Sequence, residues 1–518
     1  MYMEDEANYA APYKSRLPSQ GHLCETKFFV TGRIWAHSMR NSQAEKRKGP
    51  RICGTGGTLI NTWKETFIKT FPNLVVPGDN QDVLDASALT RFQRLHNLAL
   101  PSGGLRVRPH TTDDIAAVVR LAGTMNVSVI ARGGGSGVVQ GIFPDERSVI
   151  LDLSGLNAIG TLDRENGHIE AEAGANAEKL EAQLATHGFT LGHWPQSMAL
   201  ATVGGLVATK SIGQYSSRYG GIEDMVRGLY LVTGTGDTLH MGAPAPRRSA
   251  GPELLPLVIG SEGTLGVITR VRLKVWPTPA AEKGLTIMLP GFSEGLQVMR
   301  RWMQSGLCPS VVRLYDPAEA GRTFSSVRGQ AVLIAVFHGP GTVVEASVAE
   351  AAALADFLGT PGDSAMIQRW FDTRNDVSAW VPLLRQGFLV DTIEVAGYWR
   401  VLPALYRAIV SRVSTIPQVV GITGHASHAY PDGANLYFTF MAKPPTPSDG
   451  PALYRQIWTA AMEETLAQGG SVSHHHGVGR LRTHWVAEER GPEFEWARQI
   501  RQLFDPHGIM NRGVLWPT

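Results

Sequence analysis

Cysteine is scarce in this sequence: the 518 residues contain Cys24, Cys53 and Cys308 and no others. Three widely spaced cysteines cannot form a disulfide framework, so we expect an intracellular, reducing environment. An excess of one charge sign is also missing, because 48 Lys and Arg face 46 Asp and Glu. The only basic cluster is Lys46, Arg47 and Lys48, and a chain of this kind gives no indication of a nucleic-acid partner.

Long hydrophobic runs are absent as well. No run approaches the roughly 18 apolar residues of a membrane-spanning helix. Residues 1–23 show no apolar core of the kind found in a secretory signal. The sequence also lacks G-x-x-x-x-G-K-[ST], which argues against a P-loop nucleotidase.

Glycine, in contrast, is abundant, with 57 residues in the chain, whereas an average protein has roughly 7% Gly. A disordered linker would be poor in apolar residues, but here 43% of the residues are hydrophobic and 18% are charged. The composition is therefore globular, and the excess glycine must lie in turns, close backbone approaches or ligand loops. The length corresponds to roughly two to four domains.

The hydrophobic pattern predicts an α+β fold. Short strands are expected over 105–108, 127–131, 149–153, 169–173 and 271–276, and helices over 63–71, 86–98, 112–122 and 177–187. Thr111 and the acids Asp113 and Asp114 supply the start of the third helix. Residues 1–60 lack a clear pattern and are interpreted as an extension, and Pro277 and Pro279 mark a domain boundary.

Three loops rich in small residues follow one another between residues 133 and 268. The first, at 133–141, comes directly after a predicted strand but does not match G-x-G-x-x-G. Taken alone, it is equally compatible with a flexible turn and with a loop whose backbone N–H groups bind phosphate. The later loops, at 195–221 and 260–268, indicate one long ligand that lies against several backbone stretches. A dinucleotide is the natural candidate.

The order of these loops resembles a known family. GGGSG, then PQSMALATVGGLVATKSIGQYSSRYGGIEDMV, then GSEGTLGVIT resemble the FAD-binding domain of the vanillyl-alcohol-oxidase superfamily, also called the PCMH-type domain. The resemblance implies noncovalent FAD, with the pyrophosphate at the first loop and at 195–202, and the adenosine or isoalloxazine along 262–268. The implied cofactor-binding residues are Arg132, Gly133, Gly134, Gly135, Ser136, Gly137, Val138, Gln196, Ser197, Met198, Ala199, Leu200, Ala201, Thr202, Thr209, Lys210, Ser211, Ile212, Glu262, Gly263, Thr264, Leu265, Gly266, Val267 and Ile268.

The expected architecture is a PCMH-type FAD-binding domain with an α+β cap domain that binds the substrate. We place an N-terminal extension and helical arm at 1–100, the FAD-binding domain at 101–278 and the cap at 279–468. Residues 469–518 are expected to fold back and complete an active site between the two domains.

A run of three histidines, His474, His475 and His476, is the second notable motif. Neighbours on a strand point to opposite faces, so three adjacent histidines rarely ligate one ion, and a polar surface turn is the simple alternative. Within the superfamily, SHHHGVGR-L-R resembles alkyldihydroxyacetonephosphate synthases. Related 2-hydroxy-acid dehydrogenases carry S-G-E-H-G-I-G, whose Glu and His belong to a metal site. His475 replaces that Glu, and we expect no metal.

Tyr437 lies in a string, 424–438, that corresponds to the metal string G-H-x-G-D-G-N-x-H of those dehydrogenases. The His expected after the Asn is replaced by Tyr437. The string resembles the synthase's Y-D-x-G-A-x-x-Y-F, whose second Tyr is the acid–base residue. The alternative is an aromatic residue packed in the core. Strand alternation places Tyr437 on the face opposite Phe438 and Phe440, which is compatible with a cavity.

Two arginines and one further histidine complete the candidate site. Arg313 lies in a P-S-V-V-R-L segment that resembles the synthase's P-A-S-I-R-L, and Arg385 resembles that family's substrate-phosphate Arg. Arg suits this role because its charge is fixed and its fork is bidentate. His193 matches the active-site His before the P-x-S turn. For a lone Arg, a solvated ion pair is the usual alternative.

The resemblance implies exchange of the acyl group of acyl-dihydroxyacetone phosphate for a fatty alcohol, through a flavin adduct and without net redox change. It also implies a lipid-like substrate, contact with a membrane surface and a homodimer. One alternative is an FAD-linked oxidoreductase that oxidises a 2-hydroxy acid or an alcohol. The missing metal-string Glu and His disfavour it, although many superfamily members oxidise substrates without a metal. A flavin-binding scaffold without activity is disfavoured by the retained Tyr, His and Arg set.

The chain also departs from the synthase pattern. Residues 393–399 read I-E-V-A-G-Y-W where the synthase has F-E-T-S-A-P-W. Residues 16–23 resemble the N-terminal peroxisomal signal R-L-x5-H-L but are one residue short, and residues 515–518 are no peroxisomal address. We expect a cytoplasmic location, or a peroxisomal one in a eukaryote.

Overall fold

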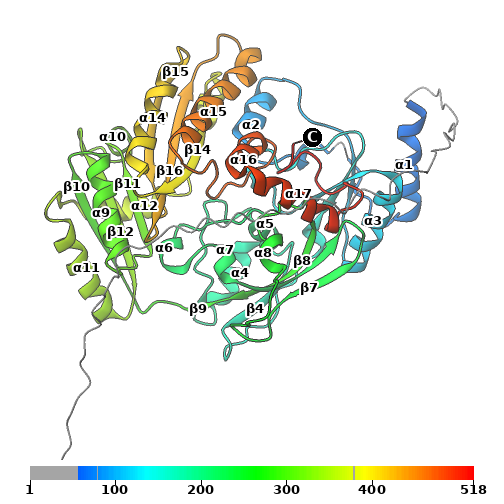
Figure 1. Cartoon of the computed structure of the whole chain (residues 1–518), viewed down its shortest axis with the longest axis horizontal. Coiled ribbons are helices and arrows are strands. Elements are labelled where there is room, and N and C mark those ends of the chain that lie inside the picture. The colour runs from blue at the N-terminus through cyan, green and yellow to red at the C-terminus, as the bar shows by residue number, and fades with distance from the viewer. Residues whose placement is uncertain (1–56, 79, 377–379, 518) are drawn as a thin grey trace, which may run out of the picture. The chain divides into compact units, whose positions relative to one another are not determined.

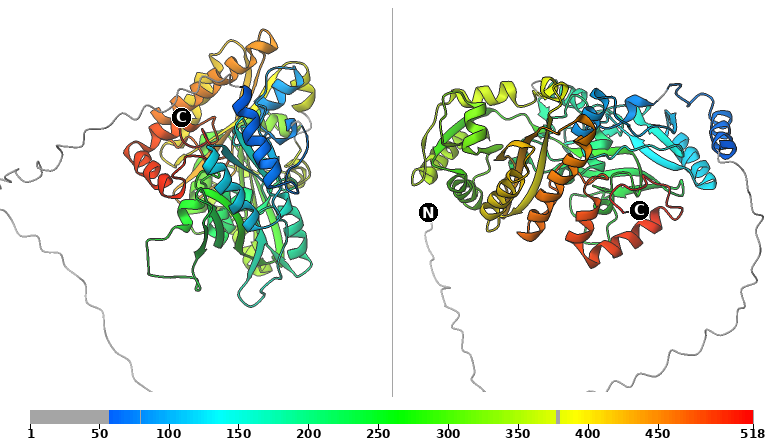
Figure 2. Two further views of the ribbon diagram at one scale, coloured as in Figure 1. Left: turned by 90° about the vertical axis from the view of Figure 1, so that its right-hand side faces the viewer. Right: turned by 90° about the horizontal axis from the view of Figure 1, so that it is seen from above.

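The computed structural model describes residues 57–78, 80–376 and 380–517. Most of the expected N-terminal extension, with the signal-like string at 16–23, lies outside the described residues. The described residues form one compact unit (Figures 1 and 2). None of the described helices has both the length and the apolarity that a membrane span needs.

Helices and strands alternate along the chain, as the hydrophobic pattern predicts. The third helix begins with a capping box, in which Thr111 accepts from the Asp114 N–H and Asp114 accepts from the Thr111 N–H. The helices are α1 Gly57–Thr70, α2 Ala88–Leu95, α3 Thr112–Met125, α4 Ala177–Ala185, α5 Val203–Ala208, α6 Ser216–Tyr219, α7 Ile222–Met225, α8 Leu255–Val258, α9 Phe292–Gln304, α10 Pro317–Thr323, α11 Gly341–Ala355, α12 Ala365–Thr373, α13 Trp380–Arg385, α14 Leu402–Ser414, α15 Gly450–Ala467, α16 Thr483–Arg490 and α17 Pro492–Phe504.

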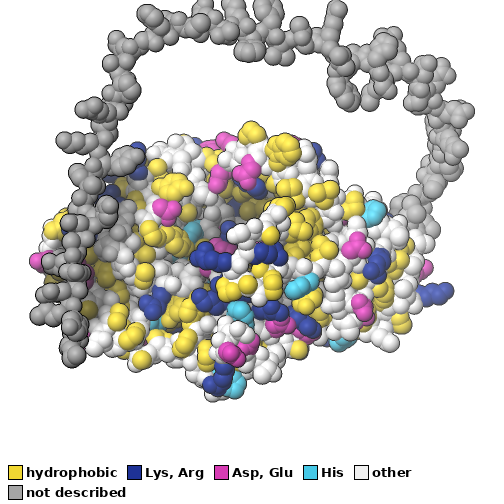
Figure 3. All heavy atoms as spheres, turned by 60° about the horizontal axis from the view of Figure 1, so that its bottom comes forward, with side chains coloured by type: hydrophobic (Ala, Val, Ile, Leu, Met, Phe, Trp, Pro, Cys, Tyr) yellow, Lys and Arg dark blue, Asp and Glu magenta, His cyan; other side chains and the backbone are white. Residues whose placement is uncertain are grey.

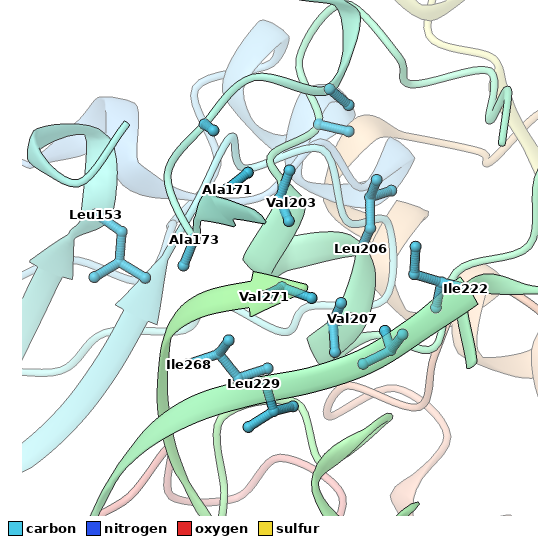
Figure 4. Close-up of a cluster of buried hydrophobic side chains, with 14 of the residues drawn as sticks. Leu153, Ala171, Ala173, Val203, Leu206, Val207, Ile222, Leu229, Ile268 and Val271 are labelled. Atoms are coloured by element: carbon cyan, nitrogen blue, oxygen red, sulfur yellow. The ribbon is translucent and has the colours of Figure 1, made fainter. Parts of the chain in front are cut away.

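The first half of the compact unit contains three small sheets. They are the parallel sheet β1–β3–β2, the antiparallel sheet β4–β8–β6–β7 and the pair β5–β9. Their strands are β1 Leu105–Val107, β2 Ser128–Arg132, β3 Ser148–Asp152, β4 His168–Glu172, β5 Phe189–Thr190, β6 Val226–Thr233, β7 Thr238–Gly242, β8 Gly266–Lys274 and β9 Trp276–Pro277. Figure 4 shows Val203, Leu206 and Val207 of α5 packed over Val271 of β8 and Leu229 of β6, all buried.

The second half is one sheet in the order β13–β10–β12–β11–β15–β16–β14. Its strands are β10 Ala281–Leu289, β11 Val311–Tyr315, β12 Ala331–Gly339, β13 Thr360–Pro361, β14 Leu389–Tyr398, β15 Val419–Ala426 and β16 Gly433–Ala442. Strand β12 is buried on both faces, and alternate residues enter different cores. Val332 and Ile334 pack with the first half, whereas Leu333 and Ala335 pack beneath the cap helices. The sheet therefore separates two hydrophobic cores.

The last residues of the chain return to the first half (Figure 2). The Val129 N–H donates to Ile509 O at 2.8 Å, and the Asn511 N–H donates to Val129 O at 2.9 Å, so this segment borders β2. The described part of the expected helical arm is also integrated, because Phe67 lies in the first core and Phe92 in the second. The boundary proposed near 278 falls between β9 and β10, which belong to different sheets.

The charged side chains on the surface agree with the nearly equal numbers of basic and acidic residues in the sequence. On the face in Figure 3, Lys and Arg side chains gather near the middle, and hydrophobic and acidic side chains lie among and around them. This face therefore carries charges of both signs.

Candidate functional site

The first glycine loop presents free backbone donors. Residues 134–138 follow β2 and are partly exposed, and none of their N–H groups donates a hydrogen bond to a residue that the structure describes. Arg132 lies directly beside this loop and is held by the carbonyl oxygen of Val83 at 3.1 Å. A row of unpaired amide N–H groups next to a fixed positive charge fits an anionic group such as a pyrophosphate.

The glycines of this loop allow it to approach the second loop. A Cβ at Gly134 would collide with the carbonyl oxygen of Leu200, and a Cβ at Gly133 would collide with the Thr202 hydroxyl. That hydroxyl is buried and has no hydrogen-bond partner among the described residues. The fold thus brings together the two loops that the sequence assigns to the pyrophosphate, and it leaves an unused polar atom between them.

The third loop joins the flavin-binding half to the histidine string. Glu262 adopts a left-handed backbone (φ 50°), and its buried carboxylate accepts from the Val478 N–H at 2.6 Å and the Gly479 N–H at 2.8 Å. Burial raises the pKa of Glu262. Its carbonyl oxygen accepts from Asn511 Nδ2 at 2.7 Å. The polar groups of Glu262 are therefore used within the protein. Leu265, Val267 and Ile268 lie in the first core, so the assignment of 262–268 to the cofactor stays a prediction.

Asp85 belongs to the same region, although no sequence pattern singled it out. Its Oδ2 accepts from the Gly141 N–H at 2.8 Å, and the neighbouring Ala86 N–H donates to Gly137 O at 2.7 Å. Burial raises the pKa of Asp85 to about 7. The segment before α2 is thus part of the loop region and not a separate arm.

His193 lies at the base of the second loop. It is fully buried, and its Nε2 is 3.2 Å from the Ser211 hydroxyl. Its Nδ1 has no partner among the described residues, and burial lowers the pKa of His193 to about 3. Ser211 belongs to the stretch 209–212, which follows α5. The structure gives His193 no hydrogen bond to the three histidines within the described chain.

A buried carboxylate holds the backbone of the three histidines. Glu394 of β14 has no exposed surface. Its Oε2 accepts from the His474 N–H at 2.6 Å and its Oε1 from the His476 N–H at 3.0 Å. Arg482, also fully buried, places Nη1 2.7 Å from Glu394 Oε1 and 2.8 Å from Val472 O. The string is therefore a fixed loop and not a surface turn.

The histidine side chains form a neutral cluster. The Nδ1 atoms of His474 and His475 are 2.9 Å apart, and His474 Nε2 is 3.1 Å from the hydroxyl of Tyr430. Burial lowers the pKa of His474 to about 4 and of His476 to about 3, and it lowers the pKa of His475 well below its usual range. At neutral pH these side chains are therefore uncharged imidazoles.

Tyr437 lies between two of the imidazole rings. Its ring stacks on His425 at 4.6 Å between centroids and on His475 at 5.7 Å, while Phe438 and Phe440 lie in the core. Burial raises the pKa of Tyr437 to about 12, although a hydrogen bond to Thr392 opposes this shift. The phenol therefore keeps its proton at neutral pH.

Arg313 of β11 is oriented by a histidine and a carboxylate. Its Nη2 is 2.9 Å from His425 Nε2, and His425 Nδ1 is 3.0 Å from Glu319 Oε1. A guanidinium only donates, so Nε2 accepts and the Nδ1–H of His425 donates to Glu319. Burial opposes ionisation of Glu319, but the adjacent His425 and Arg313 lower its pKa to about 2. The Nε of Arg313 is buried and has no partner among the described residues.

Arg385 is not brought to this cluster. It ends α13 with its side chain exposed, whereas the preceding Leu384 is buried in the cap core. Within the described chain it makes no hydrogen bond, ion pair or ring contact. The helix turns Leu384 inward and therefore directs Arg385 to solvent, so Arg313 is the arginine that the fold places beside the histidines.

Three of these side chains also meet the spacing of a metal site. Glu394, His474 and His475 offer ligand atoms within 4.8 Å of one another. However, both Glu394 oxygens accept hydrogen bonds from Arg482 or the backbone, and the two Nδ1 atoms bond each other. A carboxylate that is already paired with Arg is a poor ligand for a divalent ion, and the absence of a metal stays a prediction.

Two family models match the chain. One is described as FAD binding domain and covers residues 104–242, and the other is described as FAD linked oxidases, C-terminal domain, and covers residues 278–515. An uncharacterized FAD-linked oxidoreductase, YgcU, of Escherichia coli O157:H7 is 34% identical over 462 residues, which span 85% of this chain and 95% of the relative.

Two further relatives and a solved structure have named activities. The alkyldihydroxyacetonephosphate synthase of Caenorhabditis elegans is 29% identical over 449 residues, or 78% of this chain and 74% of the relative. D-lactate dehydrogenase of Archaeoglobus fulgidus is 27% identical over 458 residues, or 83% and 96%. A structure of alkyldihydroxyacetonephosphate synthase superposes with a TM-score of 0.69 at 25% identity, covering 88% of this chain and 85% of that chain.

The loops, the two-part α+β fold and these matches define a flavoenzyme that uses FAD as its cofactor. The chain belongs to the vanillyl-alcohol-oxidase, or PCMH-type, family of FAD-linked oxidases. The expected fold class and cofactor are thereby confirmed. The residue assignments and the noncovalent attachment of FAD stay predictions.

Proposed function

We propose that the protein is an alkyldihydroxyacetonephosphate synthase-like transferase, which exchanges the acyl group of acyl-dihydroxyacetone phosphate for a fatty alcohol. The observation that carries this proposal is the stack of His425, Tyr437 and His475, with Arg313 bonded to His425. Tyr437 and His475 occupy the positions where the dehydrogenase strings have a metal-site His and Glu. A phenol, neutral imidazoles and a fixed cation thus stand where that subfamily places an ion.

Each side chain in this stack has a role that its surroundings allow. Arg313 binds the substrate phosphate through its unused Nε, since its Nη2 is committed to His425. Tyr437 would supply the proton of its hydroxyl to a leaving oxygen, and the raised pKa of this phenol means that it still carries that proton at neutral pH. His475 accepts a proton at Nε2, the ring atom for which the structure records no hydrogen bond with a described residue.

FAD, when bound, would supply an electron-accepting ring for the reaction. The N–H groups of 134–138 and the charge of Arg132 would hold its pyrophosphate, and residues 263–268 would lie along its ring systems. Contact with a membrane surface, a homodimeric assembly and an intracellular location belong to the same proposal, because they follow from a lipid-like substrate and from the resemblance.

The second candidate is an oxidoreductase that acts on a 2-hydroxy acid or an alcohol. It is favoured by the 34% identity to YgcU of Escherichia coli and by the similarity to a D-lactate dehydrogenase. The same Arg313 would then bind a carboxylate, and the neutral cluster would accept the hydroxyl proton of the substrate. The two candidates differ in whether electrons leave the substrate.

One experiment separates them. The purified FAD-loaded protein is incubated without oxygen, once with acyl-dihydroxyacetone phosphate plus a labelled fatty alcohol and once with a panel of 2-hydroxy acids. We expect label in an ether product and flavin that is oxidised again when the reaction is complete. Bleaching of the flavin by a hydroxy acid, together with formation of the oxo acid, would overturn the synthase proposal and establish the second candidate.

A further inference from the structure

Tyr430 is hydrogen-bonded to the histidine cluster. It lies between β15 and β16, and its hydroxyl is 3.1 Å from His474 Nε2. Beyond His474, the two facing Nδ1 atoms extend the chain of hydrogen bonds to His475 at 2.9 Å. A side chain that no motif assigned a role is therefore two hydrogen bonds away from the proposed proton acceptor.

Another hydrogen bond lies beside this chain, on α6. The Ser216 hydroxyl is 2.8 Å from His428 Nδ1, and the rings of His428 and His474 lie 5.3 Å apart between centroids. Next to it, the Ala429 N–H donates to the Ser217 hydroxyl at 3.3 Å. The hydrogen-bonded groups, in order, are His475, His474 and Tyr430, and we name them the relay chain.

The hydrogen bonds of the relay chain can point in either of two directions. The facing Nδ1 atoms share a single proton, since two lone pairs or two N–H groups would repel each other. When Tyr430 donates to His474 Nε2, His474 carries its proton on Nδ1 and His475 carries its proton on Nε2. When Tyr430 instead accepts from His474 Nε2, His475 donates through Nδ1 and its Nε2 is an open acceptor.

A charged imidazole is disfavoured anywhere in the relay chain. The property that can still vary is the direction in which its hydrogen bonds point. Burial lowers the pKa of His474, of His475 and of His428, and the neighbouring His476 and Arg313 lower that of His428 further. Glu394 faces the same cluster but is paired with Arg482. Neutral imidazoles can exchange donor and acceptor roles by tautomerisation without storing a charge.

We propose that Tyr430 is a positioning residue that sets the tautomer of His475 through His474. With Tyr430 accepting from His474 Nε2, both bonds of the relay chain point away from His475. His475 Nε2 is then the acceptor that the proposed function requires, and the inference rests on that function for its catalytic consequence only.

One variant and one control test this inference in the FAD-loaded protein. Tyr430→Phe removes the hydroxyl and keeps the ring. Tyr398→Phe is the control, because Tyr398 is exposed and the structure records no hydrogen bond from its hydroxyl to a described residue. Flavin content and the unfolding temperature of each variant show whether the fold is intact.

The first readout needs no turnover. In protein labelled with ¹⁵N-histidine, with signals assigned by His474→Gln and His475→Gln, we expect His475 in the Nδ1–H tautomer. Tyr430→Phe should shift it toward the Nε2–H tautomer, and Tyr398→Phe should not. An Nε2–H tautomer in the parent protein, or no change in Tyr430→Phe, would overturn the inference even where the proposed function holds.

The second readout is kinetic and uses whichever substrate the anaerobic experiment establishes. General base catalysis is worth about 10²–10⁴-fold in rate, so partial loss of the acceptor tautomer should lower kcat on the order of tenfold. We expect KM and the flavin content to stay unchanged and the pH profile of kcat to move. A parent-like kcat and pH profile in Tyr430→Phe would contradict the inference, whereas absence of both activities in the parent would contradict the proposed function alone.

Discussion

Glu394 and Arg482 form an ion pair with no exposed surface on either side chain, and Arg482 Nη1 lies 2.7 Å from Glu394 Oε1. The same carboxylate accepts the N–H groups of His474 and His476, so the pair fixes the backbone of the histidine string. Glu394 lies 80 positions before His474 in the sequence. A contact between distant parts of the chain thereby determines where the imidazoles lie.

Arg482→Met should strongly destabilise the protein. Removal of one partner from a buried pair leaves the other charge uncompensated, which typically costs about 3–5 kcal/mol. We expect a lower midpoint in chemical denaturation and loss of activity in the remaining folded protein. The control is Arg498→Met, which breaks an exposed pair with Glu495 and should leave the midpoint unchanged. Equal midpoints for the two variants would disprove the importance of the buried pair.

Gly134→Ala should disrupt the contact between the two pyrophosphate loops. The added Cβ would collide with the carbonyl oxygen of Leu200, and backbone cannot move aside as a flexible side chain can. We expect the purified variant to contain less than a tenth of the parent's flavin per protein, measured from the visible absorbance. Gly341→Ala is the matched control, because a Cβ there meets nothing within 4 Å. Normal flavin content in Gly134→Ala would argue against these loops as the cofactor site.

Much of the fold could be predicted because its signals are local. The capping residues before α3, the period-2 pattern of β16 and the order of the three glycine loops each lie within a short stretch, and each has the expected form in the structure. The matches to FAD-binding and FAD-linked oxidase domains confirm the fold class that these patterns indicate.

The site was less predictable because its contacts are not local. Glu262 reaches a loop 216 residues away, and Arg313 acquires its orientation from His425, 112 residues away. No spacing along the chain reveals such pairs. Arg385 is the opposite case, in which a local similarity was misleading about position. Its resemblance to a family string suggested that it binds a phosphate, whereas the packing of Leu384 turns the Arg385 side chain to solvent.

Glu319→Gln should weaken substrate binding through Arg313. The carboxylate fixes the tautomer of His425 that accepts from Arg313, and an amide could equally present its NH₂ group and reverse that tautomer. We expect KM for the anionic substrate to rise on the order of tenfold, the cost of one charge-assisted hydrogen bond. Glu345→Gln, on the exposed face of α11, should leave KM unaltered. A rise in KM in both variants would remove the specific link to Arg313.

Asp85→Asn should change how stability depends on pH. The folded-state pKa of Asp85 is raised to about 7 from its ordinary 3.8, so the folded protein binds this proton more tightly than the unfolded chain does. The stabilisation is therefore complete below about pH 4 and is lost as the pH rises through 7, with a total on the order of 4 kcal/mol. An amide cannot ionise, so the variant should lose less stability than the parent between pH 5 and pH 8.

Denaturant midpoints at these two pH values measure the effect. Glu262 also has a raised pKa, so the parent minus variant difference, and not the parent slope alone, isolates Asp85. Asp432→Asn, at an exposed carboxyl in the turn before β16, is the control and should follow the parent. Since Asp85 accepts from Gly141 beside the first glycine loop, flavin retention should follow the same pH dependence in the parent and flatten in Asp85→Asn. Parallel pH curves for parent and variant would show that Asp85 does not carry this proton.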